Sequence, residues 1–166
     1  MIGFNTYKTR WGRGALVFSH KGLAYTVFPQ ENDLQLEEEI AKRFGVLKYN
    51  EHLGQDLSYS LGLYFNGERI QFDYQLDYGR SSEFEKLVYE HLKAVPYGKV
   101  INYKELAKRC GHPKAARAVG NALAKNPMPV VIPCHRVLKS DGSIGGWSGK
   151  RGWKERLLAI EGVRWE

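Results

Sequence analysis

The sequence has 166 residues, 43% of them hydrophobic and 26% charged, the composition of an ordinary globular protein with one large core or two small ones. The N-terminal stretch contains no long apolar run, so we expect neither a signal peptide nor a membrane-spanning helix. The net charge of +7 is uneven: residues 1–81 hold 9 Lys and Arg against 10 Asp and Glu, and residues 82–166 hold 16 against 8. This excess favours a polyanion-binding function for the second half.

The first half is predicted to mix helices and strands. Two apolar runs separated by Ser19-His20-Lys21-Gly22 indicate a hairpin, and the alternation of apolar and polar residues in RIQFDYQLD is typical of a half-buried strand. The expected elements are strands over 15–18 and 23–28, a helix capped by Asn32 or Asp33 that runs to Phe44, a helix over 55–65, and a strand over 69–77. Residues 77–81 are the expected linker.

The second half is predicted to be mainly helical. Capping boxes are formed by Ser82 with Glu85 and by Asn102 with Glu105. The expected helices are one that follows Ser82 and breaks at 96–98, one from Tyr103 to about Arg109, one over 114–126, and one over about 150–160 that Gly162 ends. Two short helices across a Gly-containing turn form a helix-turn-helix candidate, although a generic helical hairpin fits the same pattern.

The helix within residues 114–126 is unusually smooth, which here means that most of its side chains are small. Apart from Arg117, the side chains of its first half are small, and its small residues are Ala115, Ala116, Ala118, Gly120, Ala122 and Ala124. Small side chains allow close approach of a partner, which is either another helix of the same domain or a nucleic-acid backbone.

Cys134 stands beside His135 and Arg136, directly after an apolar run bounded by two prolines. A lone cysteine in such a place is either inert core or a nucleophile. A zinc site is not expected, because there is no CxxC or spaced Cys/His set, and a disulfide with Cys110 is not expected in a reducing compartment. An unperturbed cysteine has a pKa near 8.5, so a nucleophile needs help. The cationic neighbours suit a thiolate.

The second half also resembles a known family. The resemblance is carried by PVVIPCHRVLKSDGSIGGWSG together with PYGKVINYKELA and GHPKAARAVGNALAKNP upstream. These stretches are similar to the O6-alkylguanine-DNA alkyltransferases, also called methylated-DNA–protein-cysteine methyltransferases, from about Phe84 to Gly162. The resemblance implies an α+β protein with a small mixed α/β supporting domain, residues 1–78, and a mainly helical DNA-binding and alkyl-acceptor domain with a helix-turn-helix, residues 82–166.

The family match implies a chemical role for four residues. Cys134 matches the alkyl acceptor, and His135 matches the base that takes its proton through a bound water. Glu161 matches the residue that orients the histidine. Tyr103 matches the tyrosine that donates a hydrogen bond or proton to guanine N3 as the O6–alkyl bond breaks. The product is a thioether that the site cannot hydrolyse, so each molecule is expected to act once.

The same match implies how DNA is held. Arg117 matches the arginine that fills the gap left by the flipped nucleotide, on a helix that enters the minor groove. The other residues assigned to DNA binding are Ala115, Ala116, Gly120, Arg136 and Asn126, of which Asn126 also ties the recognition helix to the active-site loop. The substrate pocket is assigned to Pro129, Val137, Trp147 and Ser148. Many relatives carry tyrosine in place of Trp147, which puts the pocket size in question.

The expected partner is double-stranded DNA that contains O6-alkylguanine. No cofactor, metal, membrane or obligate protein partner is expected, and the protein is expected to be an intracellular monomer, cytoplasmic, or nuclear in a eukaryote. Three other classes of function stay open: a binding module that flags alkylguanine without repair, a Cys-His hydrolase, and a plain helix-turn-helix regulator. Cys134 argues against the first and last, and the DNA-binding features argue against the hydrolase.

Overall fold

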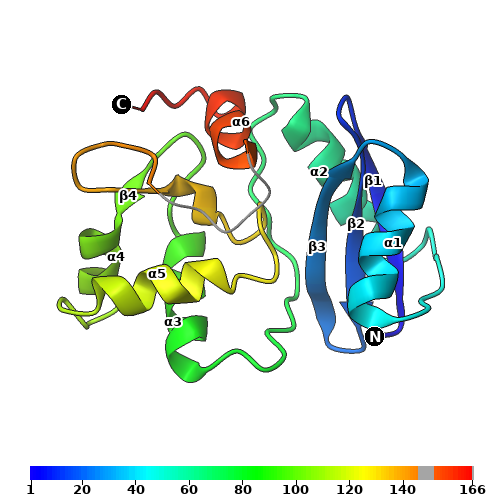
Figure 1. Ribbon diagram of the computed structural model, residues 1–166, viewed down its shortest axis with the longest axis horizontal. Coiled ribbons are helices and arrows are strands. Elements are labelled where there is room, and N and C mark those ends of the chain that lie inside the picture. Colours follow the sequence, from blue (N-terminus) through cyan, green and yellow to red (C-terminus); the bar gives the residue numbers. More distant parts are fainter. Residues whose placement is uncertain (146–151, 166) are drawn as a thin grey trace. The chain divides into compact units, whose positions relative to one another are not determined.

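The computed structural model describes residues 1–145 and 152–165, and the chain divides into two compact units, Met1–Gly79 and Arg80–Glu166. The first unit mixes a sheet with helices, and the second is mainly helical (Figure 1). The expected α+β class is therefore confirmed. In the part of the chain that the structure describes, no helix has the length and apolar character needed to cross a membrane.

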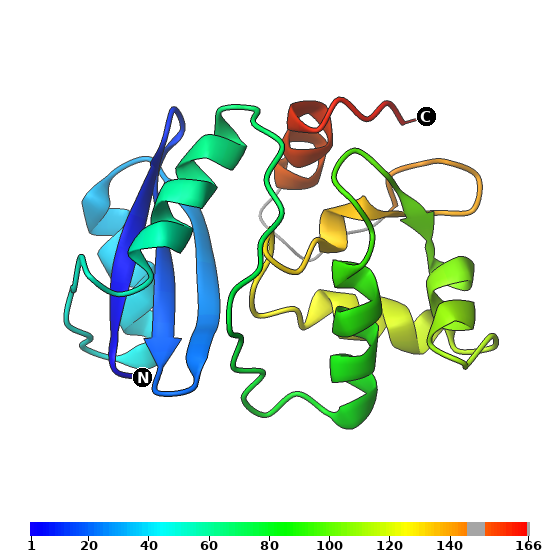
Figure 2. The same cartoon turned by 180° about the vertical axis from the view of Figure 1, so that it is seen from behind.

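The first unit is a three-stranded antiparallel sheet with a helix on each face. Its elements are β1 (Gly3–Thr9), β2 (Gly12–Ser19), β3 (Gly22–Gln30), α1 (Asp33–Phe44) and α2 (Gln55–Phe65). Figure 1 shows α1 in front of the sheet, and Figure 2 shows α2 from behind. Because β2 is the middle strand and is covered on both faces, its segment 15–18 is buried throughout and forms a continuous apolar run instead of an alternating one.

Each helix of the first unit is fixed by its end signals and its apolar face. The Asn32 side chain accepts a hydrogen bond from the Gln35 backbone N–H and begins α1. Leu36 and Ile40 of α1 pack against one face of the sheet, in a cluster with Ala15 and Val27. On α2, the Phe65 ring stacks on Tyr7 of β1 with 5.6 Å between ring centroids. The hairpin and both helices are thus confirmed.

Two predictions for the first unit were wrong or incomplete. The alternating segment 69–77 is not a strand of the sheet: it forms one bridge, in which Leu23 N–H donates to the Gln75 carbonyl and Asp77 N–H donates to the Leu23 carbonyl. The predicted alternation of buried and exposed side chains is present. Such alternation shows that the backbone is extended, but it does not show that the segment is hydrogen-bonded to another strand. Strand β1 was not predicted.

In its described residues, the second unit contains four α-helices and a short parallel strand pair. Its elements are α3 (Glu83–Lys93), β4 (Ile101–Asn102), α4 (Tyr103–Arg109), α5 (Ala116–Ala124), a 3₁₀ turn (Cys134–Arg136), β5 (Val137–Leu138) and α6 (Trp153–Ile160). The capping box of Ser82 and Glu85 is present at the start of α3. Helix α5 begins later than expected, because Ala115 N–H donates to the His112 carbonyl in a turn that precedes the helix.

Strands β4 and β5 bring two parts of the sequence together. Ile101 pairs with Val137, and Asn102 pairs with Leu138. The start of α4 therefore lies beside the chain that leaves the 3₁₀ turn. This places Tyr103, the first residue of α4, close in space to the cysteine segment.

Candidate active site

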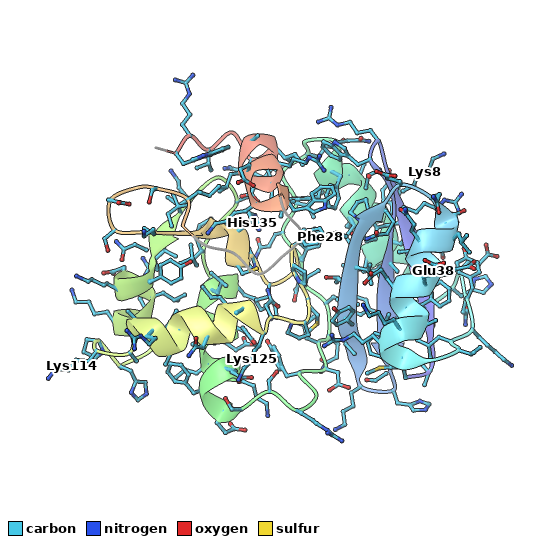
Figure 3. All side chains as sticks on the ribbon, viewed as in Figure 1. Lys8, Phe28, Glu38, Lys114, Lys125 and His135 are labelled. Atoms are coloured by element: carbon cyan, nitrogen blue, oxygen red, sulfur yellow. The ribbon has the colours of Figure 1, made fainter. Side chains whose placement is uncertain are left out.

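The 3₁₀ turn places its three side chains in the interior of the second unit. Cys134 is 3% exposed, His135 is 0% exposed and Arg136 is 6% exposed. Figure 3 labels His135 on this turn, beneath α6. A buried histidine and a buried arginine next to a cysteine need compensating partners, because burial of unpaired polar or charged groups is costly.

The loop before the turn is tied to the end of α5 by Asn126. Its Nδ2 donates to the Ile132 carbonyl at 2.8 Å, and its Oδ1 accepts from the Met128 N–H at 2.9 Å. Within this loop, buried Val130 has a φ of +78°, a strained conformation for a β-branched residue that costs about 1–3 kcal/mol. Asn126 thus bonds to the backbone on both sides of Val130. These hydrogen bonds hold the strained loop in place and fix the chain segment that leads into Cys134.

Glu161 supplies the partner for both basic residues of the turn. His135 Nε2 lies 2.5 Å from Glu161 Oε2, and Arg136 Nε donates to Oε1 at 2.9 Å. The Gly98 backbone N–H also donates to Oε1 at 2.9 Å. Although burial raises the pKa of Glu161, the hydrogen bonds of His135 and Arg136 and the charge of Arg136 outweigh it and lower the pKa to about 2. Glu161 is therefore an ionised, buried carboxylate.

These contacts fix the state of His135. Burial lowers the pKa of His135, against the hydrogen bond and charge of Glu161, so we assign a neutral ring at pH 7. Because the ionised carboxylate only accepts, the proton of the neutral ring is on Nε2. Nδ1 then carries the lone pair. A neutral histidine in this tautomer, oriented by a carboxylate, is suited to act as a general base.

The structure corrects the assignment of Arg136 to DNA binding. Its guanidinium is buried, with Nε and one terminal nitrogen on Glu161 and the other terminal nitrogen donating to the Val95 carbonyl at 2.7 Å. A buried arginine whose three guanidinium nitrogens are hydrogen-bonded inside the protein is not available to bind a phosphate. Arg136 belongs to the buried site, where it compensates Glu161.

Tyr103 lies between two glycines, Gly120 of α5 and Gly145 of the loop after β5. A methyl group added at Gly120 of α5 would lie 3.9 Å from its ring, and one added at Gly145 would lie 3.8 Å from its hydroxyl. Burial, and secondarily the charge of Cys134, raise the pKa of Tyr103. The phenol therefore stays protonated and can donate a hydrogen bond. Gly120, which the sequence assigned to DNA contact, lies against this ring.

Helix α5 buries one side and presents a smooth side to solvent. The Tyr89 hydroxyl donates to the Ala122 carbonyl at 2.8 Å, and Val119 is fully buried. Arg117 and Ala118 are exposed, whereas Ala115 and Ala116 are half-buried at its start. Figure 3 shows Lys114 and Lys125 at opposite ends of the helix. The exposed side is thus small-residue surface around one arginine, with a lysine at each end.

The remaining pocket residues are only partly described. Pro129 is half-buried and bridges to Ile132, and Val137 is fully buried at the end of the turn. Trp147 and Ser148 lie outside the described residues. Among residues 1–145 and 152–165, no group of three or more His, Cys, Asp or Glu side chains is arranged to hold a metal ion.

Sequence reasoning missed Lys154. This lysine is 2% exposed, and its Nζ donates to the Val137 carbonyl at 2.7 Å. The available signal was its spacing: Lys154, Leu158 and Glu161 recur at i, i+4 and i+7, on one face of α6. The backbone N–H of Gly98 was also missed, and no side-chain pattern could have revealed it.

Residues 83–163 match the family described as 6-O-methylguanine DNA methyltransferase, DNA binding domain. The chain is 46% identical over 101 residues to the methylated-DNA–protein-cysteine methyltransferase of Mycolicibacterium paratuberculosis, covering 61% of each protein. It is 42% identical over 113 residues to that of Methanosarcina acetivorans, covering 68% of this chain and 72% of the relative. The matched segment thus spans about 61% of the length of the first of these relatives.

A solved structure extends the similarity to both units. The crystal structure of Mycobacterium tuberculosis OGT in complex with DNA superposes with a TM-score of 0.78 at 29% identity, and the match covers 96% of this chain and 92% of that one. The first unit, which the sequence matches leave largely uncovered, is included in this superposition. The chain belongs to the methylated-DNA–protein-cysteine methyltransferase family.

Proposed function

We propose that this protein repairs O6-alkylguanine in double-stranded DNA by transferring the alkyl group irreversibly to its own Cys134. The observation that carries the proposal is the buried turn in which Cys134 adjoins the His135–Glu161 pair, in the same unit as the α4–α5 helical pair. A DNA-binding element and an activated cysteine in one compact unit fit a reaction performed on DNA. The homologous OGT structure contains DNA.

The proposed transfer begins at the thiol. The Cys134 proton passes through a bound water to Nδ1 of His135, whose Nε2–H is held by Glu161. The thiolate attacks the alkyl carbon, the carbon–O6 bond breaks, and its electron pair stays on the guanine. Tyr103 donates a hydrogen bond or proton to guanine N3 as this charge develops. The proton held by His135 then returns through solvent, either to Tyr103 if the phenol gave up its own or to guanine directly. The products are therefore neutral guanine and a thioether on Cys134, so the protein is consumed in one turnover.

Substrate access is assigned to α5. A base inside a duplex is beyond the reach of a buried thiol, so the nucleotide must be flipped, at a cost of about a few kcal/mol. The smooth exposed side of α5, including Ala115 and Ala116, suits close approach to the minor groove. Arg117, which is exposed on α5, is assigned to fill the gap in the stack. Asn126 transmits the position of α5 to the cysteine loop, and Pro129, Val137, Trp147 and Ser148 are assigned to the pocket.

The remaining assignments concern the whole chain. Residues 1–78 are proposed to support residues 82–166, which carry the DNA-binding and acceptor functions. Both cysteines are free thiols, as the reaction requires, and a reducing intracellular compartment maintains that state. The protein is proposed to act as a monomer, without a cofactor.

The test is a mass measurement after incubation with duplex DNA that carries one O6-methylguanine. We expect each protein molecule to gain one methyl group, located on Cys134 by peptide mapping. Cys134→Ala should gain none while it still binds the duplex, because affinity rests on phosphate contacts. The matched control, Cys110→Ala, should react as the wild type. Binding without mass gain by the wild type, or methylation at Cys110, would contradict the proposal.

A further inference from the structure

Lys154 is a buried ammonium group beside the cysteine turn. It is 2% exposed, on α6, and donates to the Val137 carbonyl at 2.7 Å. The Val137 N–H in turn donates to the Cys134 carbonyl, which closes the turn. Lys154 is therefore joined to the cysteine by two successive hydrogen bonds. A neutral carbonyl does not compensate a full positive charge in a protein interior, so an anion is expected nearby.

The charges of the buried site identify this anion. Among the buried residues of the second unit that the structure describes, Arg136 and Lys154 are cations and Glu161 is the one carboxylate. Glu161 accepts two hydrogen bonds from Arg136, which offsets the arginine, and His135 is neutral. With Cys134 as a thiol, the cluster carries one excess positive charge. With Cys134 as a thiolate and its proton released to solvent, the cluster is neutral.

We propose that Lys154 is a positioning residue for alkyl transfer, the counter-ion that holds Cys134 as a thiolate before the alkylated base arrives. The inference rests on the proposed role of Cys134 as the alkyl acceptor. His135 takes the proton and passes it on to solvent, so that its ring is neutral again, and Lys154 supplies the charge that stabilises the anion left behind. Burial lowers the pKa of Lys154 to about 8, and the charges of Cys134 and Glu155 act in the opposite direction. Such a group is still mostly protonated at pH 7.

Few of the surrounding groups titrate near neutral pH. Lys154 interacts electrostatically with Cys134 and His135 on the turn and with Glu155 on its own helix. Tyr89 of α3 and Tyr103 of α4 also interact electrostatically with Cys134, but burial raises the pKa of both phenols and keeps them neutral. The pKa of Glu161 is lowered, so Glu161 stays ionised. A pH profile between about 6 and 9 therefore reports the Cys134, His135 and Lys154 cluster.

The experiment measures the rate of Cys134 alkylation against pH, with free O6-benzylguanine and with iodoacetamide, in Lys154→Met, Lys154→Arg and the wild type. The matched control is Arg156→Met, which removes an exposed cation from the same helix. Peptide mapping separates Cys134 from Cys110. In Lys154→Met the midpoint of the profile should rise by about one pH unit. The rate at pH 7 should fall about two- to fivefold, because the wild type is already mainly a thiolate at this pH, and the high-pH plateau should be retained.

Lys154→Arg should restore most of the wild-type profile, and Arg156→Met should match the wild type. An unchanged midpoint with a lowered plateau in Lys154→Met would overturn the inference and make Lys154 a packing residue only. Because iodoacetamide needs neither DNA nor a guanine pocket, its profile tests Lys154 even if the repair function is wrong. Failure of the methylated duplex to alkylate Cys134 would instead contradict the proposed function.

A second measurement does not depend on the folding of the methionine variant. The side-chain pKa of Lys154 is followed by NMR in the wild type and in Cys134→Ser. If the thiolate is its counter-ion, removal of the sulfur should lower the pKa of Lys154 by about one unit. Equal pKa values in the two proteins would overturn the inference.

Discussion

Glu161 is the residue that joins the other groups of the buried site by hydrogen bonds. Its carboxylate accepts hydrogen bonds from His135, Arg136 and the Gly98 backbone, although it lies only one residue beyond the end of α6. Gly162 follows with a φ of +74°, a conformation that favours glycine and ends the helix at this point. The helix end thus places one buried anion where two buried basic side chains need it.

This arrangement predicts a specific acid sensitivity. The pKa of Glu161 is about 2 in the folded protein against an ordinary value of 4.5. Because the folded pKa is lowered, the stability it contributes is fully present above about pH 4.5 and is lost as the pH falls through about 2. In Glu161→Gln, Arg136 loses its counter-charge, so the free energy of unfolding at pH 7 should fall by about 3–5 kcal/mol.

Urea unfolding of the wild type and Glu161→Gln between pH 6 and pH 2 measures this effect. The variant should show a flatter dependence of the unfolding free energy on pH. Glu155→Gln, at an exposed position on the same helix, is the control and should follow the wild type. Parallel curves for the wild type and Glu161→Gln would show that Glu161 does not carry the acid-sensitive stability.

Among the secondary-structure elements, α5 carries the most specific part of the proposed interaction with DNA. Arg117 is exposed beside small residues, and its proposed work is to occupy a gap that exists only in a duplex with a flipped nucleotide. Arg117→Ala should therefore slow reaction with duplex DNA strongly, while reaction with free O6-benzylguanine should change little. Single-turnover rates with both substrates at one ionic strength make the comparison.

Lys125→Ala is the matched control for the Arg117 experiment, because it removes an exposed cation from the end of the same helix. A contact with phosphate alone lowers affinity for every duplex and reduces the salt dependence by about one unit. The control should show at most this behaviour. Equal losses on duplex and free base in Arg117→Ala would mean that Arg117 supports the fold or the pocket.

The elements also show where sequence reasoning succeeds. Helices with a capping residue and an apolar stripe, such as the one that Asn32 begins and that runs to Phe44, were predicted at their observed bounds, because end signals and periodicity are local. Segment 69–77 was misassigned because pairing depends on residues far along the chain. The burial of Arg136 and Lys154 was missed for the same reason: a charged residue is read as exposed until its distant partner, here Glu161 or Val137, is known.

For the whole molecule, the charge balance of the buried site links the chemistry to stability. Alkylation converts a thiolate into a neutral thioether, so the cluster of Arg136, Lys154 and Glu161 then keeps one uncompensated positive charge. A group with no counter-ion in the interior lowers the free energy of unfolding. In Lys154→Met, Cys134 is expected to be a thiol at neutral pH, and alkylation then changes no charge.

Thermal unfolding of unmodified and methylated protein at pH 7.5, for the wild type and for Lys154→Met, measures this link. Methylation should lower the Tm of the wild type by about 2–4 °C more than that of Lys154→Met, which corresponds to about 1 kcal/mol for a chain of this size. The added methyl group has the same volume in both proteins, so its steric effect cancels in the difference. Arg156→Met should lose as much Tm as the wild type. If methylation lowers the Tm equally in the wild type and in Lys154→Met, the loss comes from packing, and the buried ammonium plays no part in it.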